Sequence, residues 1–579
     1  MDMEETLSIT LVASSTSCPN ISYSFFQLPP LTKWASHENP TISQILVQFA
    51  IFFITLFIFH LKTKFVKVFH KRKLVTHHLP PGPHPWPIVG SVPEMFKNRP
   101  LYRWIHLVMQ ELNTEIACFR LGNTNVVAVS SPEIAREFLK KNDAVFASRP
   151  LTITSSIISR GFVGTIVTPW GEQWKKMKRV LISDVFNQSN IRWLLKKRNE
   201  EADNLVKFVY NQCSISNGGL SSSSPSSLRQ VVNVRTVAQH YSASVIRKMM
   251  FGKRYFGKGR EDGGPGDEEE EHSSALFTIL LYLYAFSVSD YLPWLRVFDF
   301  GGHKRKVNDA VEVIKKYQDG IVNERIQQWR EGKKVEAEDL LDVFISLKHE
   351  NGDPLLSSEE IKAQITEILL ATVDNPANAA EWALSEMLNR PQQLQKAVEE
   401  LDSVVGKDRL VQEHDIPNLH YINACAREAL RLHPMAPFNL PHQSVSDCVV
   451  GGYFIPKGSS ILLSRLGLGR NPGVWEDPMR FDPERHLKDG VLANQRAVAL
   501  AEPELRFITF TVGRRSCLGG WLGSTITVML FARLLQGFTW SMPPGVEKID
   551  LTEADSLLKA MPLYAHAKPR LSPTVYPAN

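Results

Sequence analysis

Cys517 lies in the part of this chain whose residue types and spacing are best suited to chemistry. The segment reads FTVGRRSCLG from Phe510 to Gly519, and an apolar run of helical length, GWLGSTITVMLFARLLQG, follows it. A cysteine at a helix N-terminus beside two arginines is expected to ionise more readily than a free thiol. Gly513 permits a tight bend, and Gly519 lets a flat group approach the backbone. The segment predicts a thiolate metal ligand at Cys517 with Arg515 as a partner for an anion, and a buried structural cysteine is the alternative.

The composition is that of an ordinary globular protein and argues against several function classes. The 579 residues are 43% hydrophobic and 22% charged, with a net charge of +6. That excess is too small to indicate nucleic-acid binding, and it suits a protein near an anionic membrane or an acidic partner. The six cysteines are scattered without a CxxC pair, which argues against a disulfide scaffold and against a structural zinc site.

The N-terminal residues predict a membrane anchor. After a leader at 1–41, residues 42–61 carry no Asp, Glu, Lys or Arg, and ~20 helical residues span the ~30 Å hydrocarbon core of a bilayer. The basic residues that follow place the C-terminal side in the cytosol and the leader in the lumen. Residues 62–87 are interpreted as a basic flank and a stiff proline-rich hinge, and residues 88–579 as the cytosolic catalytic domain. A buried core helix is the alternative for 42–61.

The region after the hinge is biased toward helix. Residues 361–390 predict one long helix, and Val126–Val129 predicts a short strand. Residues 214–227, rich in Ser and Gly, are interpreted as a surface loop. Residues 257–272 are interpreted in the same way, because an acidic run is usually solvated.

The segment around Cys517 matches the FxxGxRxCxG haem loop of cytochromes P-450, and three further motifs of that family occur in the expected order. The similarity extends from about residue 80 to the end of the chain. It implies a mainly α protein with small β-sheets (α+β), anchored in the endoplasmic reticulum membrane by one N-terminal transmembrane helix. The further motifs are ExxR at Glu428–Arg431, the PERF-like FDPERH at 481–486, and a WxxxR-like element that begins at Trp174 and has Lys178 in place of the arginine.

The resemblance also implies the cofactor and the residues that contact it. Haem b would be held by the Cys517 thiolate, which favours O–O cleavage, and NADPH would supply electrons through NADPH–cytochrome P-450 reductase. Trp174, Lys178 and Arg515 fall at positions that contact the haem or its propionates. His442 occupies the place of a frequent propionate-binding residue, and a plain surface histidine is the alternative.

Glu428 and Arg431 are three residues apart and share one face of a helix. By resemblance they form, with Arg485, a buried charge network that braces the haem. Breaking such a buried pair costs about 3–5 kcal/mol, whereas an exposed i,i+3 pair contributes only about 0.2–0.5 kcal/mol.

The family usually places an acid and two threonines on the helix that faces oxygen. This chain keeps the acid as Asp374 but has Asn375 and Pro376 in place of the threonines. Pro376 is expected to kink the helix and free the carbonyl of Thr372, so that water relays protons from Asp374. Asn375 forms hydrogen bonds but cannot relay a proton as a hydroxyl does.

This departure, in the string VDNPANAAEWAL, resembles the plant amino-acid N-monooxygenases that make aldoximes. The resemblance implies that the amino nitrogen of an L-amino acid is hydroxylated twice and that CO2 is lost, with phenylalanine as the first choice of substrate and tyrosine, tryptophan, valine and isoleucine open. An oxime-metabolising oxygenase, as in cyanogenic glucoside synthesis, would act downstream. Val512, Ser516 and Lys178 depart from the usual pattern, and Val512 is expected to remove a hydroxyl near the haem.

Four residues are candidates for holding the substrate. Arg149 or Arg160 is the expected carboxylate clamp, by charge and by placement in the loop that covers the cavity. A structural or haem-contacting role is the alternative for Arg149. Phe438 and Asn439 are expected to line the pocket.

The sequence is also compatible with three other functions. The chain fits a carbon-hydroxylating cytochrome P-450 acting on a lipophilic metabolite. It also fits a haem isomerase or dehydratase that needs no reductase, because the threonines are replaced. A haem-binding scaffold or sensor is the alternative from a different class.

Overall fold

The computed structural model describes residues 55, 78–214, 231–299, 301–493 and 500–577. The leader at 1–41, the basic flank at 62–77 and all of the expected anchor at 42–61 except Thr55 lie outside the described residues. Across the part of the chain that the structure describes, no helix combines the length and hydropathy needed to cross a membrane. The chain divides at Thr76, and the unit from His77 onward carries the features below.

Helices dominate this second unit. The mainly helical prediction with small sheets is confirmed. The longer helices are α3 (Leu101–Glu111), α8 (Leu195–Ser214), α9 (Val234–Phe251), α10 (Asp267–Tyr284), α12 (His303–Arg330), α14 (Ser358–Val373), α15 (Asn375–Leu388), α16 (Pro391–Val404), α17 (His420–Leu432) and α19 (Gly520–Gly537). The shorter helices are α2 (Val92–Lys97), α4 (Pro132–Arg136), α5 (Ile153–Ile158), α6 (Glu172–Val180), α7 (Gln188–Trp193), α11 (Val288–Tyr291), α13 (Leu340–Ser346) and α18 (Arg465–Gly469).

Short strands form four small sheets in the described residues. The first has the order β1-β2-β7-β4, in which β2 and β7 are parallel with Val126 opposite Ser460, and the second has the order β10-β11-β3. The strand expected at Val126–Val129 is confirmed as part of β2. The strands are β1 (Ile116–Leu121), β2 (Thr124–Val129), β3 (Val231–Asn233), β4 (His442–Gln443), β5 (Cys448–Val450), β6 (Tyr453–Ile455), β7 (Ser460–Leu463), β8 (Leu487–Lys488), β9 (Val491–Leu492), β10 (Phe538–Ser541) and β11 (Tyr564–Pro569).

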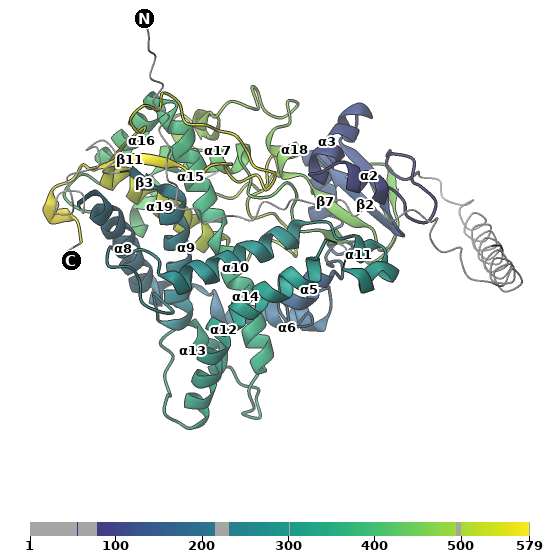
Figure 1. Ribbon diagram of the computed structural model, residues 1–579, viewed down its shortest axis with the longest axis horizontal. Coiled ribbons are helices and arrows are strands. Elements are labelled where there is room, and N and C mark those ends of the chain that lie inside the picture. The colour runs from purple at the N-terminus through teal and green to yellow at the C-terminus, as the bar shows by residue number, and fades with distance from the viewer. Residues whose placement is uncertain (1–54, 56–77, 215–230, 300, 494–499, 578–579) are drawn as a thin grey trace, which may run out of the picture. The chain divides into compact units, whose positions relative to one another are not determined.

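The largest core cluster holds the helices that position the site. α15 packs against α9, α17 and α19, while α14 packs against α10 and α12 (Figure 1). α14 begins with a capping box, in which Ser357 and Glu360 each bond the other's backbone N–H. The apolar face of α19 is buried along its length, which explains the apolar run after Cys517.

The long helix expected at 361–390 is two helices. α14 ends at Val373, and α15 begins at Asn375 with Pro376 in its first turn. Proline lacks the N–H that would continue the ladder, and it is favoured at the start of a helix. The kink expected at Pro376 is therefore a break centred on Asp374.

The proline-rich segment belongs to the folded unit and is more than a spacer. The amide of Cys118 in edge strand β1 donates to the carbonyl of Pro81 at 2.8 Å, and Phe454 donates to His78 at 2.9 Å. A Cβ added to Gly82 would lie 1.9 Å from the carbonyl oxygen of Cys118. Prolines lack an N–H but keep their carbonyl acceptors, so the segment pairs with an exposed strand edge.

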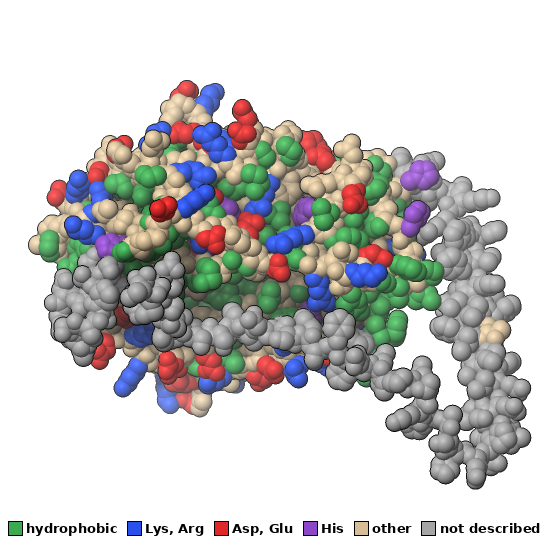
Figure 2. Space-filling view, turned by 45° about the horizontal axis from the view of Figure 1, so that its top comes forward, with side chains coloured by type: hydrophobic (Ala, Val, Ile, Leu, Met, Phe, Trp, Pro, Cys, Tyr) green, Lys and Arg blue, Asp and Glu red, His purple; other side chains and the backbone are tan. Residues whose placement is uncertain are grey.

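The acidic run interpreted as a loop instead starts a helix. Residues 257–266 are irregular, but α10 begins at Asp267, and acidic residues are favoured in a first turn. Glu269 is buried and accepts hydrogen bonds from the amides of Phe256 and Gly266. Elsewhere on the surface, acidic and basic side chains are interspersed over the face drawn in Figure 2, in keeping with the small net charge.

Candidate active site

The loop that carries Cys517 is held by its own backbone. The Cys517 amide donates to the carbonyl of Phe510 at 2.9 Å, and the Ser516 amide donates to Gly513 at 3.1 Å. Gly513 has a φ of +81°, and a Cβ there would lie 2.4 Å from the carbonyl oxygen of Leu139. The tight bend expected at Gly513 therefore requires glycine.

The Cys517 side chain faces a cavity of about 290 Å³. Burial raises the pKa of its thiol, while the Gly519 amide and the charge of Arg465 lower it. The guanidinium groups of the two neighbouring arginines have other partners, because Arg514 pairs with Asp143 at 2.8 Å and Arg515 bonds backbone carbonyls. The protein groups together therefore raise the pKa of this thiol, opposite to the expected easier ionisation, and the cation that lowers it is Arg465 rather than Arg514 or Arg515.

The cavity lies between the cysteine loop, the start of α19 and the α14–α15 break. Most of its wall is apolar, with side chains from α10 and α14. Among the described residues that line it, five are cations and only Glu367 is an acid. The cations are Arg149, Lys178, Arg465, Arg514 and Arg515.

The residues present fit a haem. Gly519 lines the cavity, and a Cβ there would have no described atom within 4 Å, so a flat group has room beside the thiol. The Nε2 atom of His442 is buried without a hydrogen-bond partner. A thiol ligand, a wide apolar wall and several cations match an iron porphyrin with two carboxylates.

The residues expected to contact the haem form one cluster. Trp174 lies under two cations, with Lys178 Nζ at 4.9 Å and the Arg515 guanidinium at 4.4 Å from its ring centroid. Lys178 Nζ donates to the carbonyl of Arg514 at 2.7 Å. Arg515 donates to the carbonyls of Ala147, Thr165 and Thr168. His442 is buried and is held by the carbonyl of Phe146 at 2.9 Å, so it is not a surface histidine.

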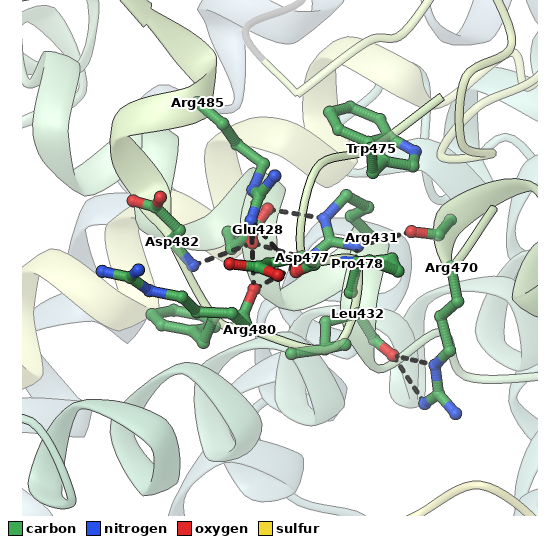
Figure 3. Close-up of polar contacts among 12 residues, drawn as sticks. Glu428, Arg431, Leu432, Arg470, Trp475, Asp477, Pro478, Arg480, Asp482 and Arg485 are labelled. Carbon is green, nitrogen blue, oxygen red and sulfur yellow. Dashed lines mark hydrogen bonds and ion pairs between the residues drawn. The ribbon is translucent and has the colours of Figure 1, made fainter. Parts of the chain in front are cut away.

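The ExxR and PERF-like motifs meet at Glu428 (Figure 3). Arg431 Nε and Nη2 donate to the two carboxylate oxygens of Glu428 at 2.7 Å each, and Arg485 Nε donates to one of them at 3.1 Å. Both Glu428 and Arg431 are fully buried. Arg431 also donates to the carbonyls of Gly469, Pro478 and Arg480, so the motif ties α17 to the loop after α18.

His486 is a fourth member that the sequence reasoning missed. Its Nε2 lies 2.8 Å from the second oxygen of Glu428, and the ring is buried. Burial alone raises the pKa of Glu428, but hydrogen bonds from Arg431 and His486 outweigh it and lower the pKa to about 2. The histidine at the end of FDPERH, where the family has phenylalanine, was the available signal.

The residues expected on the oxygen side separate into two environments. Asn375 lines the cavity and donates to the carbonyl of Ala371 at 3.2 Å. Asp374 is buried and does not line the cavity. Burial, with a smaller contribution from Glu381, raises the pKa of its carboxyl to about 7, and Arg235 acts in the opposite direction. Thr372 and Pro376 also line the cavity.

The substrate candidates are spread over different places. Arg149 is buried at the cavity but donates to the carbonyls of Ile166, Leu440 and Pro441. Arg160 pairs with Asp319 at 2.5 Å and Glu359 at 2.8 Å, and it does not line the cavity.

Phe438 and Asn439 lie where the Cys517 cavity meets a second one. Phe438 lines an adjoining cavity of about 220 Å³, whereas Asn439 lines both. Val512 packs into an apolar cluster with Phe138 and Ile508 and does not line the Cys517 cavity. The hydroxyl expected to be lost near the haem at Val512 would therefore not face this cavity.

Arg465 is the cavity residue that sequence reasoning missed most clearly. It follows the buried strand β7 as the first residue of α18. The only signal was a charged residue two positions after the apolar run Ile461–Leu463, and nothing in the sequence said which way its side chain points.

Comparison with known proteins completes the assignment. The family model described as cytochrome P450 matches residues 80–566. A tryptophan N-monooxygenase of Prunus mume is 61% identical over 94% of this chain and 98% of the relative. An isoleucine N-monooxygenase of Lotus japonicus is 54% identical over 94% and 98%, and a phenylalanine N-monooxygenase of Arabidopsis thaliana is 56% identical over 86% and 92%. The chain therefore belongs to the cytochrome P450 family of haem-thiolate monooxygenases.

Proposed function

We propose that this protein is an amino-acid N-monooxygenase that hydroxylates the amino nitrogen of an L-amino acid twice and releases the aldoxime with loss of CO2. O2 is the oxidant, and NADPH supplies electrons through a partner reductase. Haem bound through Cys517 supplies the oxygen chemistry. Residues 42–61 are proposed to anchor the chain in the endoplasmic reticulum membrane, with the catalytic unit in the cytosol.

One observation carries the proposal. The three relatives described above share 54% to 61% identity with almost the whole chain, and each name assigns N-monooxygenation of an amino acid. The cavity supports this reading, because Arg465 lines it in addition to the cations that suit the haem carboxylates and offers a partner for the carboxylate of a zwitterionic amino acid.

Residues of this chain are proposed to bind the substrate side chain, to hold a water at the cavity and to exchange a proton with that water. Apolar side chains from α10, such as Leu280 and Leu283, offer a wall for the substrate side chain. The break at Pro376 leaves the Thr372 carbonyl without its helical donor, so it can hold water at the cavity. Asp374 has a pKa of about 7, because burial raises it, and is suited to exchanging a proton with that water.

The names of the relatives specify different amino acids, so sequence identity alone does not indicate which amino acid this chain uses. They include tryptophan, isoleucine and phenylalanine. We propose an aromatic amino acid, with phenylalanine as the first choice and tryptophan as its direct competitor.

The test is turnover in microsomes that contain the full chain, a plant reductase and NADPH. Phenylalanine, tryptophan, tyrosine, valine and isoleucine are supplied separately, and oximes are identified by mass. An aldoxime from one or two of them supports the proposal. A normal carbon-monoxide difference spectrum without any oxime would overturn it, and lipophilic or hydroperoxide substrates would then be tried.

A further inference from the structure

Arg465 is a buried cation with few partners. Its side chain is only 9% exposed and lines the Cys517 cavity. Nη2 donates to Oδ1 of Asn439 at a long 3.3 Å, and Nε is buried without a hydrogen-bond partner. Among the described residues, no carboxylate forms an ion pair with it. A buried guanidinium in this state is costly unless an anion joins it.

The other buried arginines of the cavity are already satisfied. Arg149 and Arg515 each donate to three backbone carbonyls. These two interact electrostatically with each other and with His442, and Lys178 also feels the charge of Arg515. Arg465 is not part of that group, because its charged or polar neighbours are Tyr284, Cys517 and Asp374.

Asp374 does not replace the missing anion. Burial raises the pKa of its carboxyl to about 7, so only part of the population carries a charge near neutral pH. Asn439 adds a second donor instead, since its Nδ2 is buried and unpartnered and the residue lines the same cavity. The Arg465–Asn439 pair therefore offers a guanidinium and an amide N–H to one ligand, the donor set that suits a carboxylate.

We propose that Arg465, assisted by the side-chain amide of Asn439, binds the carboxylate of the substrate. The proposal rests on the function proposed above and names the residues that select an amino acid over the corresponding amine. A haem propionate has the same chemistry, but Lys178 and the buried, unpartnered Nε2 of His442 are available for it, and neither is among the groups that interact electrostatically with Arg465. In this proposal Arg465 binds the substrate carboxylate in place of Arg149 or Arg160, which the sequence had suggested.

The test is a ligand titration of the full-length holoenzyme, followed by the shift of the haem absorption band. L-Phenylalanine and L-tryptophan are compared with phenethylamine and tryptamine, which keep the side chain and nitrogen but lack the carboxylate. Arg465→Gln should weaken amino-acid binding by about tenfold to a hundredfold and leave amine binding nearly unchanged. Arg465→Lys should be intermediate, because it keeps the charge without the planar fork.

Asn439→Asp is a second variant of nearly the same shape. Its carboxylate should pair with Arg465 and occupy the position of the substrate carboxylate, so amino-acid binding falls while amine binding persists. Arg247→Gln is the matched control. Arg247 is another buried arginine without an acid partner among the described residues, bonded to Arg254 and Ser244 and outside the cavity lining. Its amino-acid to amine affinity ratio should equal that of the wild type.

An unchanged affinity ratio in Arg465→Gln would overturn the proposal. Partial loss of haem in that variant, with an unchanged ratio in the fraction that keeps haem, would also overturn it and assign Arg465 to a propionate. The titration needs no turnover, which separates it from the proposed function. Carboxylate-dependent binding without oxime formation would overturn only the function, whereas oxime formation with an unchanged ratio would overturn only the clamp. A wild type that binds no amino acid would overturn both.

Discussion

Arg431 donates from Nε and Nη2 to the two carboxylate oxygens of Glu428, with both distances at 2.7 Å and both side chains fully buried. The same carboxylate receives Arg485 Nε and the amide of Asp482. Removing it would leave Arg431 as a buried charge with only carbonyl partners. A buried pair of this kind contributes little when intact but is costly to break.

We therefore expect Glu428→Ala to lower the free energy of unfolding by about 3–5 kcal/mol and to lose most of its haem. Haem content per folded chain and the melting temperature measure both effects. The matched control is Glu484→Ala, which removes a carboxylate whose ion pair with Lys396 is half exposed and should cost less than about 1 kcal/mol. A Glu428→Ala protein with normal haem content would show that the network does not brace the site.

The members of this network were predictable from sequence, but its fourth partner was not. Helical spacing places Glu428 and Arg431 on one face, and the family resemblance adds Arg485. The histidine in FDPERH was a signal that this position is unusual, but its contact with Glu428 depends on the packing of the loop after α18. Arg465 was missed for the same reason, because the direction of a side chain at a strand end depends on tertiary packing.

Local patterns also gave two wrong element boundaries. The helix at 361–390 was expected as one piece, since a helical period continues across Pro376, yet the missing N–H splits it at Asp374. The acidic run at the start of α10 was interpreted as a solvated loop, but its residues form the first turn of the helix and Glu269 caps it. In both cases the chemistry of a helix end outweighed the average character of the segment.

Ser516 departs from the glycine usual in the haem loop, and the structure predicts that the departure is tolerated. Ser516 does not adopt a positive φ, so its side chain causes no backbone strain. Ser516→Gly should lower the free energy of unfolding by about 0.4–1 kcal/mol, because glycine gives the unfolded chain more freedom, and leave haem content unchanged. The contrast is Gly513→Ser, where a φ of +81° and the nearby Leu139 carbonyl forbid a side chain. That variant should lose haem, and equal haem content in the two would contradict the prediction.

The break between α14 and α15 gives a prediction about coupling, which is the yield of oxime per NADPH consumed. Pro376→Ala supplies the missing N–H, which can bond the Thr372 carbonyl and join the two helices. We expect the melting temperature to hold or rise, while the yield of oxime per NADPH falls and hydrogen peroxide increases, because the carbonyl no longer holds water at the cavity.

Pro391→Ala is the control for this change, since Pro391 begins α16, is exposed and lies where no N–H is needed. Its product yield should match that of the wild type. A Pro376→Ala protein with unchanged coupling would remove the Thr372 carbonyl from proton supply.

Asp374 gives a prediction about pH. Burial raises the pKa of its carboxyl from its ordinary range to about 7 in the folded protein. Between about pH 4 and pH 7 the folded state keeps a proton that the unfolded chain has released, so this residue makes stability fall as pH rises through that window. Above about pH 7 the cost is complete, at about 2–4 kcal/mol. Asp374→Asn removes the titrating group and should abolish this part of the pH dependence.

The measurement is the melting temperature of the holoenzyme at pH 5.5 and pH 8 for the wild type, Asp374→Asn and the exposed control Asp309→Asn. Asp374→Asn should gain more stability at pH 8 than at pH 5.5, because only at the higher pH does the wild type carry the buried charge. Asp309→Asn should follow the wild type at both values. An equal gain at the two pH values would mean that Asp374 keeps one protonation state from pH 5.5 to pH 8, and the buried carboxyl would then be unsuited to exchanging protons near neutral pH.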